Sequence, residues 1–233
     1  MSSSAQHPLD TPIWSALATE HQHLRQGGAL ACRYRPDVAQ FAAVAEDSPA
    51  AWQELQRLIE PGGQVTVWTL APVGELPGLH VARPGVLHQL MAPHGAHWPV
   101  ESADIVRLGD ADAADMLDLT RRTEPGPFKV RTHTMGNYIG LRDGGKLIAM
   151  AGERLRIGGY VEISTVCVDD AYRGRGIANR LIRILQNEIG QRGQTPFLHV
   201  LDHNSGAFGL YERMGFERRQ SFHLTRLQRQ EPA

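Results

Sequence analysis

One stretch decides the fold of this chain: Ile163-Ser-Thr-Val-Cys-Val-Asp-Asp-Ala-Tyr-Arg-Gly-Arg-Gly-Ile-Ala178. It begins with β-branched and small apolar residues, which are typical of an internal strand. Asp169 and Asp170 end this strand, and a turn containing Gly174 and Gly176 follows. Apolar residues then recur at spacings of three and four, which predicts an amphipathic helix directly after the turn. They are Ile177, Leu181, Ile184, Leu185 and Ile189.

A glycine-rich turn between a strand and a helix N-terminus is suited to bind phosphate. The first helical N–H groups have no partner within the helix, and the helix dipole is positive there. Glycine lets the backbone approach an anion closely, and two arginines in the turn add positive charge. The turn matches neither G-x-G-x-x-G nor the P-loop pattern. It does match R-x-x-G-x-A, through Arg173, Gly176 and Ala178.

A second motif follows downstream: Asn204-Ser-Gly-Ala-Phe-Gly-Leu-Tyr-Glu-Arg-Met-Gly-Phe216. It fits the pattern N-x-x-A-x-x-L-Y-x-x-x-G-F almost position for position. With both motifs in this order, the sequence resembles the GNAT superfamily of acyl-CoA-dependent N-acyltransferases. The resemblance spans about residues 101–228. Within the superfamily the sequence is most similar to the glycine N-acyltransferase-like branch, through its Glu-Ile-Ser-x-Val and Leu-His-Val passages.

The resemblance implies an α/β fold in which helices flank a mixed, splayed central β-sheet. The pattern of residues 101–228 predicts the element order β-α-α-β-β-β-α-β-α-β, which is the GNAT order. Residues 1–100 are expected to form a smaller α/β region, compatible with a degenerate copy of the same fold. In that region we expect a frayed terminus over 1–12, helices over 14–26 and 37–45, and a linker at residues 93–99.

The composition of the 233 residues is that of an ordinary globular protein, with 42% hydrophobic and 21% charged residues. A net charge of -1 gives no indication of a nucleic-acid or membrane partner. Cys32 and Cys167 form no C-x-x-C pair, and the eleven histidines show no metal-ligand spacing, so no metal is expected. No apolar run approaches the ~18 residues of a membrane span, which favours a cytoplasmic protein.

The resemblance also implies the reaction. Acetyl-CoA is the expected co-substrate, and a primary amine of a small molecule or peptide is the expected acceptor. The amine would attack the thioester directly in a ternary complex. The alternatives are a catalytically silent CoA-binding module that serves as a sensor or scaffold, and a nucleotide-phosphate binder. A homodimer is left open.

The resemblance assigns the strand and loop of the opening stretch to the co-substrate. For the three strand residues only the backbone is implied, because their side chains are expected to pack in the sheet. Asn204 is equally well explained as a helix N-cap. The expected co-substrate residues are Val166, Cys167, Val168, Arg173, Gly174, Arg175, Gly176, Ile177, Ala178 and Asn204.

Tyr211 is the expected general acid toward the CoA sulfur, by resemblance. Its phenol, with a pKa near ~10, is protonated at neutral pH and can donate a proton. A core tyrosine at helical spacing is the alternative explanation.

Glu162 is the first candidate for the general base. Strict alternation along the strand places it on the face of Ser164, Val166 and Val168, with Cys167 on the opposite, more apolar face. Partial burial of this glutamate would raise its pKa toward ~6–7, where a base is useful. Glu153 on the preceding strand and water are the alternatives.

Overall fold

The computed structural model describes residues 7–93, 95 and 97–230. A three-stranded sheet has the order β1-β2-β3, and an eight-stranded sheet has the order β4-β11-β5-β10-β9-β8-β7-β6. The strands are β1 (Arg25–Gly27), β2 (Ala31–Tyr34), β3 (Ala42–Val44), β4 (Gln64–Thr69), β5 (Leu79–Met91), β6 (Ile105–Leu108), β7 (Tyr138–Asp143), β8 (Lys146–Ile157), β9 (Tyr160–Val168), β10 (Thr195–Leu201) and β11 (Glu217–Arg229).

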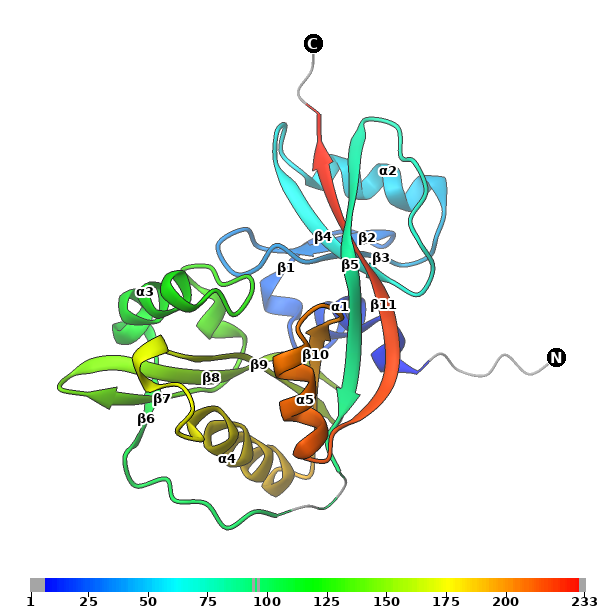
Figure 1. Cartoon of the computed structure of the whole chain (residues 1–233). Coiled ribbons are helices and arrows are strands. Elements are labelled where there is room, and N and C mark those ends of the chain that lie inside the picture. Colours follow the sequence, from blue (N-terminus) through cyan, green and yellow to red (C-terminus); the bar gives the residue numbers. More distant parts are fainter. Residues whose placement is uncertain (1–6, 94, 96, 231–233) are drawn as a thin grey trace.

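The helices cover both faces of the large sheet. Figure 1 shows α3 and α4 on opposite faces of its β6–β9 part. The α-helices are α1 (Pro12–Ala18), α2 (Pro49–Leu58), α3 (Ala113–Thr123), α4 (Ile177–Gln191) and α5 (Ser205–Arg213). The 3-10 helices are η1 (Pro8–Asp10), η2 (Gln22–Leu24), η3 (Asp110–Asp112), η4 (Thr132–Met135) and η5 (Asp170–Tyr172). The mixed α/β fold and the element order expected for residues 101–228 are confirmed. No described helix combines the length and the apolar character needed to cross a membrane.

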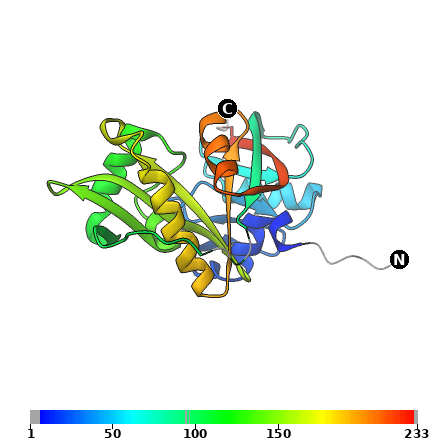
Figure 2. The same ribbon diagram turned by 60° about the horizontal axis from the view of Figure 1, so that its bottom comes forward.

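The large sheet takes strands from both parts of the chain. The early strand β5 pairs antiparallel with β10 and with the C-terminal strand β11, and β11 also pairs with β4. Figures 1 and 2 show β5 and β11 running side by side into the part formed by the first hundred residues. The division into domains 1–100 and 101–228 stays a prediction, since shared strands do not decide whether either part folds alone. The expected linker at 93–99 includes residues 94 and 96, which lie outside the described residues.

The first forty-five residues differ most from the expectation. The helix predicted over 14–26 ends at Ala18, and the segment predicted as a helix over 37–45 contains strand β3. Residues 7–12, predicted as part of a frayed end, pack on the fold, because Leu9 is fully buried and Asp10 pairs with Arg219 at 2.7 Å. Tertiary contacts of this kind override local helix spacing in short segments. The part of the frayed-end prediction covering residues 1–6 lies outside the described residues.

The sheet splays between its two middle strands. β9 and β10 run parallel and pair only where residues 160–162 meet residues 195–197. Beyond this point β9 continues beside β8 and β10 continues beside β5. The facing edges of β9 and β10 therefore carry backbone N–H and C=O groups with no partner strand. The splayed sheet expected from the resemblance is present.

A β-bulge interrupts β9 within the splayed region. Met150 of β8 faces Cys167, while Gly152 faces Ser164, so β9 holds one extra residue between these pairs. Thr165 has φ +53, an uncommon conformation for a β-branched residue. Backbone held in this way is often found at functional sites.

The bulge reverses which side of the sheet the later residues of β9 face. Ile163 and Val168 both pack into the core beneath α4, whereas Cys167 packs beside residues of α3 on the other face. The predicted face shared by Glu162 and Val168 is therefore wrong, as is the predicted grouping of Ile163 with Cys167. Strict alternation fails because one inserted residue shifts a period of two by half a period.

Candidate active site

A cavity of about 880 Å³ lies along the splayed strands. One wall is formed by β9 and by the loop that leads into α4, and another by β10 and α5. The far side is formed by residues of β4 and β11 and by Gln40 and Phe41. The cavity therefore joins segments from both parts of the chain. We call the part around the α4 N-terminus the donor end, and the part around β4 and β11 the acceptor end.

The donor end is built on the N-terminus of α4. Gly174 and Gly176 have φ +76 and +75, and an added Cβ at either would meet nothing within 4 Å. No side chain caps α4, and no partner is seen in the described chain for the N–H groups of Ile177, Ala178 and Asn179. These three residues line the cavity. The N-terminus thus presents free donors and a positive dipole to the cavity, as an anion site requires.

Asp169 anchors the loop between β9 and α4. Its carboxylate accepts hydrogen bonds from Lys146 at 3.0 Å and from the Ala171 N–H at 3.2 Å, and it pairs with Arg122. The hydrogen bond from Lys146, with those from Ala171 and Arg122, lowers the pKa of Asp169 to about 2. The carboxylate is therefore ionised at neutral pH and fixes the start of the loop against α3 and β8.

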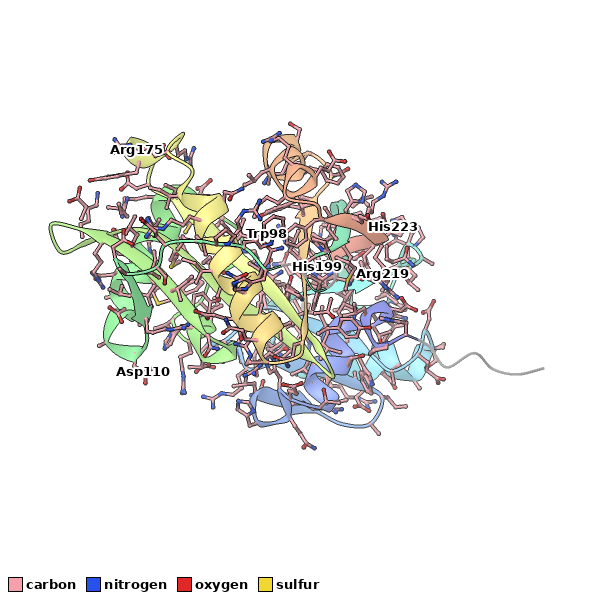
Figure 3. The ribbon with its side chains drawn as sticks, turned by 90° about the horizontal axis from the view of Figure 1, so that it is seen from below. Trp98, Asp110, Arg175, His199, Arg219 and His223 are labelled. Atoms are coloured by element: carbon pink, nitrogen blue, oxygen red, sulfur yellow. The ribbon has the colours of Figure 1, made fainter. Side chains whose placement is uncertain are left out.

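The two loop arginines are held by the loop itself. Arg173 donates to the Val168 carbonyl at 3.3 Å, and Arg175 lies over the Tyr172 ring at 5.0 Å. Arg173 lines the cavity, whereas Arg175 does not. Figure 3 shows Arg175 at the edge of the molecule, away from His199 near its middle. Of the two predicted phosphate-binding arginines, the structure brings only Arg173 to the cavity.

The strand residues assigned to the co-substrate, Val166, Cys167 and Val168, all line the cavity beside the bulge. Their side chains pack in the two cores of the sheet, as expected. Burial raises the pKa of the Cys167 thiol to about 11, so it is protonated at neutral pH and unsuited to act as a nucleophile. The contribution of this segment to a ligand is therefore its unpaired backbone edge.

Tyr211 and Asn204 both lie on the cavity wall formed by α5. Burial raises the pKa of Tyr211 to about 12, which keeps its hydroxyl protonated as a donor over the neutral range. Asn204 is the N-cap of α5, and its side chain accepts a hydrogen bond from the Ala207 N–H at 3.2 Å. The capping interpretation of Asn204 is thus confirmed, and the residue also lines the cavity.

Glu162 lies in a buried ionic cluster. Arg154 donates to both carboxylate oxygens, at 2.9 and 2.6 Å, and Nδ1 of His199 lies 2.7 Å from one of them. Burial alone would raise the pKa of Glu162, but the charge of Arg154, together with the hydrogen bonds from Arg154 and His199, outweighs it and lowers the pKa to about 2. The expected rise toward ~6–7 is therefore wrong. Glu162 itself does not line the cavity, whereas Arg154 and His199 do.

His199 is held as a neutral ring. The Gln89 amide nitrogen lies 3.1 Å from its Nε2 and can only donate, so Nε2 accepts and Nδ1 carries the hydrogen toward Glu162. Burial lowers the pKa of His199, and Glu162 only partly offsets this. The cluster of Arg154, Glu162 and His199 therefore carries no net charge at neutral pH.

Two aromatic rings support this cluster from the acceptor end. The Arg154 guanidinium lies 5.0 Å from the Phe41 ring centroid and 5.5 Å from that of Trp68. Trp68 also packs on His199, with ring centroids 4.7 Å apart. These contacts place the first part of the chain directly on the wall of the cavity.

The sequence did not single out the residues of the acceptor end. Its nearest signal is a charged or polar residue inside an apolar strand, as with Arg154 after Ala149-Met-Ala-Gly152, and His199 within Phe197-Leu-His-Val200. The rival base Glu153 is buried and pairs with Arg192 at 2.6 Å, outside the cavity lining. Within residues 7–93, 95 and 97–230, no group of three or more His, Cys, Asp or Glu side chains is placed to hold a metal ion.

Comparison with solved structures decides the family. A GNAT-family protein from Novosphingobium aromaticivorans, assigned as an acetyltransferase, is 35% identical to this chain. The match covers 98% of this chain and all of the other, with a TM-score of 0.88. The chain belongs to the GNAT family.

A family model and a sequence relative also agree with GNAT membership, and a second solved structure shares the fold. A family model described as FR47-like protein matches residues 138–225, which include both sequence motifs. The N-alpha-acetyltransferase RimI of Mycobacterium tuberculosis is 41% identical over 86 residues, and the match spans 35% of this chain and about half (52%) of that protein. A GNAT protein from Kribbella flavida shares the fold over 97% of this chain, with a TM-score of 0.67 and 15% identity.

Proposed function

We propose that this GNAT protein transfers an acetyl group from acetyl-CoA to a primary amine, by direct attack in a ternary complex. The observation that carries the proposal is the single cavity that joins the uncapped α4 N-terminus, the splayed edge of β9 and the hydroxyl of Tyr211. These are the groups that acyl transfer needs: a site for the pyrophosphate, backbone donors for the thioester carbonyl, and an acid for the departing sulfur.

In this proposal the α4 N-terminus and Arg173 hold the pyrophosphate. The unpaired backbone of Val166 to Val168 holds the pantetheine arm and polarises the thioester carbonyl. The amine attacks that carbonyl, the C–N bond forms and the C–S bond breaks. Tyr211 gives its proton to the departing thiolate, and the proton lost by the amine leaves to water.

Glu162 enters the proposal as a positioning residue. Both of its oxygens are engaged by Arg154 and His199, and a carboxylate with a pKa of about 2 is a weak base at neutral pH. It holds two cavity-lining side chains in place. The sequence-based assignment of Glu162 as general base stays a prediction. A folded Glu162→Gln variant that keeps the full kcat would remove that role.

The acceptor is the less defined half of the reaction. The match to an N-alpha-acetyltransferase supports an α-amine as the group acetylated. The predicted likeness to the glycine N-acyltransferase-like branch remains a hypothesis about the acceptor. Both are compatible with a cavity open to a primary amine beside the splayed strands.

Calorimetric titration tests the proposal first. We expect micromolar binding of acetyl-CoA and no binding of ATP or NAD, followed by release of free CoA thiol when a suitable amine is added. Equal binding of ATP would indicate a nucleotide-phosphate site instead. Binding of acetyl-CoA without thiol release across a broad amine panel would favour the silent CoA-binding module.

A further inference from the structure

The acceptor end of the cavity contains one cationic side chain that the proposed chemistry does not use. Arg226 of β11 is exposed, lines the cavity, and forms no side-chain hydrogen bond or ion pair with any described residue. Arg154, the other arginine nearby, is neutralised by Glu162. The charge of Arg226 is therefore the uncompensated charge at this end.

Strand register places polar groups beside Arg226. Arg226 of β11 lies opposite Thr66 of β4, and Leu224 lies opposite Trp68. Since residues two apart share a face, Thr66, Trp68, Leu224 and Arg226 line the same side of the sheet, and all four line the cavity. The Thr66 hydroxyl accepts a hydrogen bond from the Gln40 amide at 3.2 Å, which brings a third polar side chain to this wall.

This cluster is distinct from the phosphate site of the donor end. In the sheet, β11 stands three strands from β9, which corresponds to about 14 Å at ~4.8 Å per strand. Figure 3 shows Arg175 of the donor loop on one side of His199 and His223 of β11 on the other. Two strands, β5 and β10, therefore stand between Arg226 and the strand that leads into the α4 loop.

The charges that line the cavity disfavour an acceptor that carries a second positive charge. Among the described residues, the lining includes a single carboxylate, that of Glu124, which caps the C-terminus of α3. A second positive charge on the acceptor would have no carboxylate beside Arg226 with which to form an ion pair. A negative group would find an arginine fork together with the hydroxyl of Thr66 and the amide of Gln40. Guanidinium binds carboxylate in paired hydrogen bonds.

We infer that the acceptor is a small amine that also carries a carboxylate, held by Arg226 with Thr66 and Gln40. The inference rests on the acetyl transfer proposed above and names its acceptor class. The aromatic wall of Trp68 and Phe41 then contacts the body of the acceptor between its carboxylate and its amine. Because Arg226 is remote from the reacting atoms, its contribution is uniform binding, which appears in KM rather than in kcat.

The test compares acceptors that differ only in charge. Each of the twenty common amino acids is offered beside its amide, with acetyl-CoA and the full chain, and CoA thiol release is followed. We expect at least one amino acid to exceed its amide by tenfold or more in kcat/KM. The amide has the less basic amine and so the larger free-base fraction, which acts against the expected result.

Variants assign the preference to Arg226. Arg226→Gln should raise KM for the preferred amino acid by about ten- to a hundredfold, the size of a lost hydrogen bond to a charged group, and leave the amide unchanged. Arg226→Lys should keep part of the preference. Arg218→Gln is the matched control, because Arg218 is an exposed arginine of the same strand outside the cavity.

Several outcomes would overturn the inference. One is that the amides are turned over as well as the amino acids. Another is that the preference for the amino acid survives in Arg226→Gln. A third is that no amino acid is turned over although acetyl-CoA still binds. A tenfold loss of acetyl-CoA affinity in Arg226→Gln would place this residue in the donor site and also overturn it. Failure of the wild-type chain to bind acetyl-CoA would instead remove the proposed function.

Discussion

The two ends of the cavity are built in different ways. The donor end comes from one continuous segment, in which the end of β9, the loop and the start of α4 follow each other along the chain. The acceptor end combines Gln40 and Phe41 with residues of β4 and β11, which meet only through sheet pairing. Local sequence therefore encodes the donor end, whereas the acceptor end depends on the whole fold.

The buried cluster around Glu162 joins the two ends and gives the largest expected effect. Glu162→Gln leaves the Arg154 charge buried without its partner, which should cost about 3–5 kcal/mol of unfolding free energy. Urea denaturation measures this cost. Glu188→Gln is the control, because its ion pair with Arg107 is at the surface and should contribute under ~1 kcal/mol. Equal losses in the two variants would show that the cluster is not a structural junction.

The unfolding free energy should fall in two pH windows, one due to His21 in the first part of the chain and one due to Glu162 in the second. Burial lowers the pKa of His21, in the first part, to about 4, while Glu162 has a pKa of about 2. His21 is neutral in the folded state, so its contribution is complete above pH ~6.5 and is lost as the pH falls toward 4. The contribution of Glu162 is lost only between about pH 4.5 and 2.

Each loss is roughly 3 kcal/mol, because the pKa of His21 falls from 6.5 to about 4 and that of Glu162 from 4.5 to about 2. Stability measured by urea denaturation from pH 7 to 3 should decline first in the His21 window. His21→Gln should flatten the curve between pH 6.5 and 4 and leave the lower window intact. A curve that is unchanged in this variant would contradict the assignment.

Segments with a local signature could be predicted from the sequence, whereas features that depend on distant segments could not. The loop with Gly174 and Gly176, and the segment with Asn204 and Tyr211, were found because glycine turns and caps have local signatures. The bulge at Thr165 has no such signature, and it moved Val168 to the other face of the sheet.

The pKa of Glu162 could not be predicted from the sequence either, because it depends on partners from other strands. Arg154 and His199 come from β8 and β10, and only the folded sheet brings them to Glu162. The sign of the pKa shift is set by the charge of Arg154 and by the hydrogen bonds of both residues, rather than by burial. No period or motif in one sequence contains that information, which also explains why Arg226 and Trp68 were not recognised as cavity residues.

Tyr211 tests whether the cavity is catalytic or only binds. Tyr211→Phe should lower kcat by about a hundredfold, the lower range for a lost general acid, and leave the Kd of acetyl-CoA unchanged. The control is Tyr160→Phe, which removes a hydroxyl outside the cavity. Stopped-flow or steady-state thiol release gives kcat, and calorimetry gives Kd. Unchanged turnover in Tyr211→Phe would remove the acid role.

Gly176→Asp tests the donor end alone. The aspartate adds a Cβ and a negative charge where the pyrophosphate is proposed to bind, so the Kd of acetyl-CoA should rise about thirtyfold. Gly193→Asp is matched in backbone strain, because Gly193 has φ +71 and lies in the turn after α4, at its opposite end. Both variants should lose similar stability, and only the first should lose affinity. Similar affinity losses would mean that strain, not the cradle, is responsible.

The smallest expected effect distinguishes the two roles of Asn204. Asn204 caps α5 at the cavity, and Ser48 caps α2 in the first part of the chain by the same geometry, accepting from the Ala51 N–H at 3.3 Å. Replacing either residue by alanine should cost about 1 kcal/mol of stability, because one helical N–H loses its partner. Thermal or urea denaturation should therefore show two similar losses.

The two caps should differ only in ligand binding. The Asn204 side chain uses its oxygen for the cap, which leaves its NH₂ group available to a ligand in the cavity. Asn204→Ala should then raise the Kd of acetyl-CoA about fivefold, the size of one neutral hydrogen bond, while Ser48→Ala leaves it unchanged. If calorimetry gives the same Kd for both variants, Asn204 is only a cap, and the proposed acetyl-CoA site reduces to the loop, α4, the β9 edge and Tyr211.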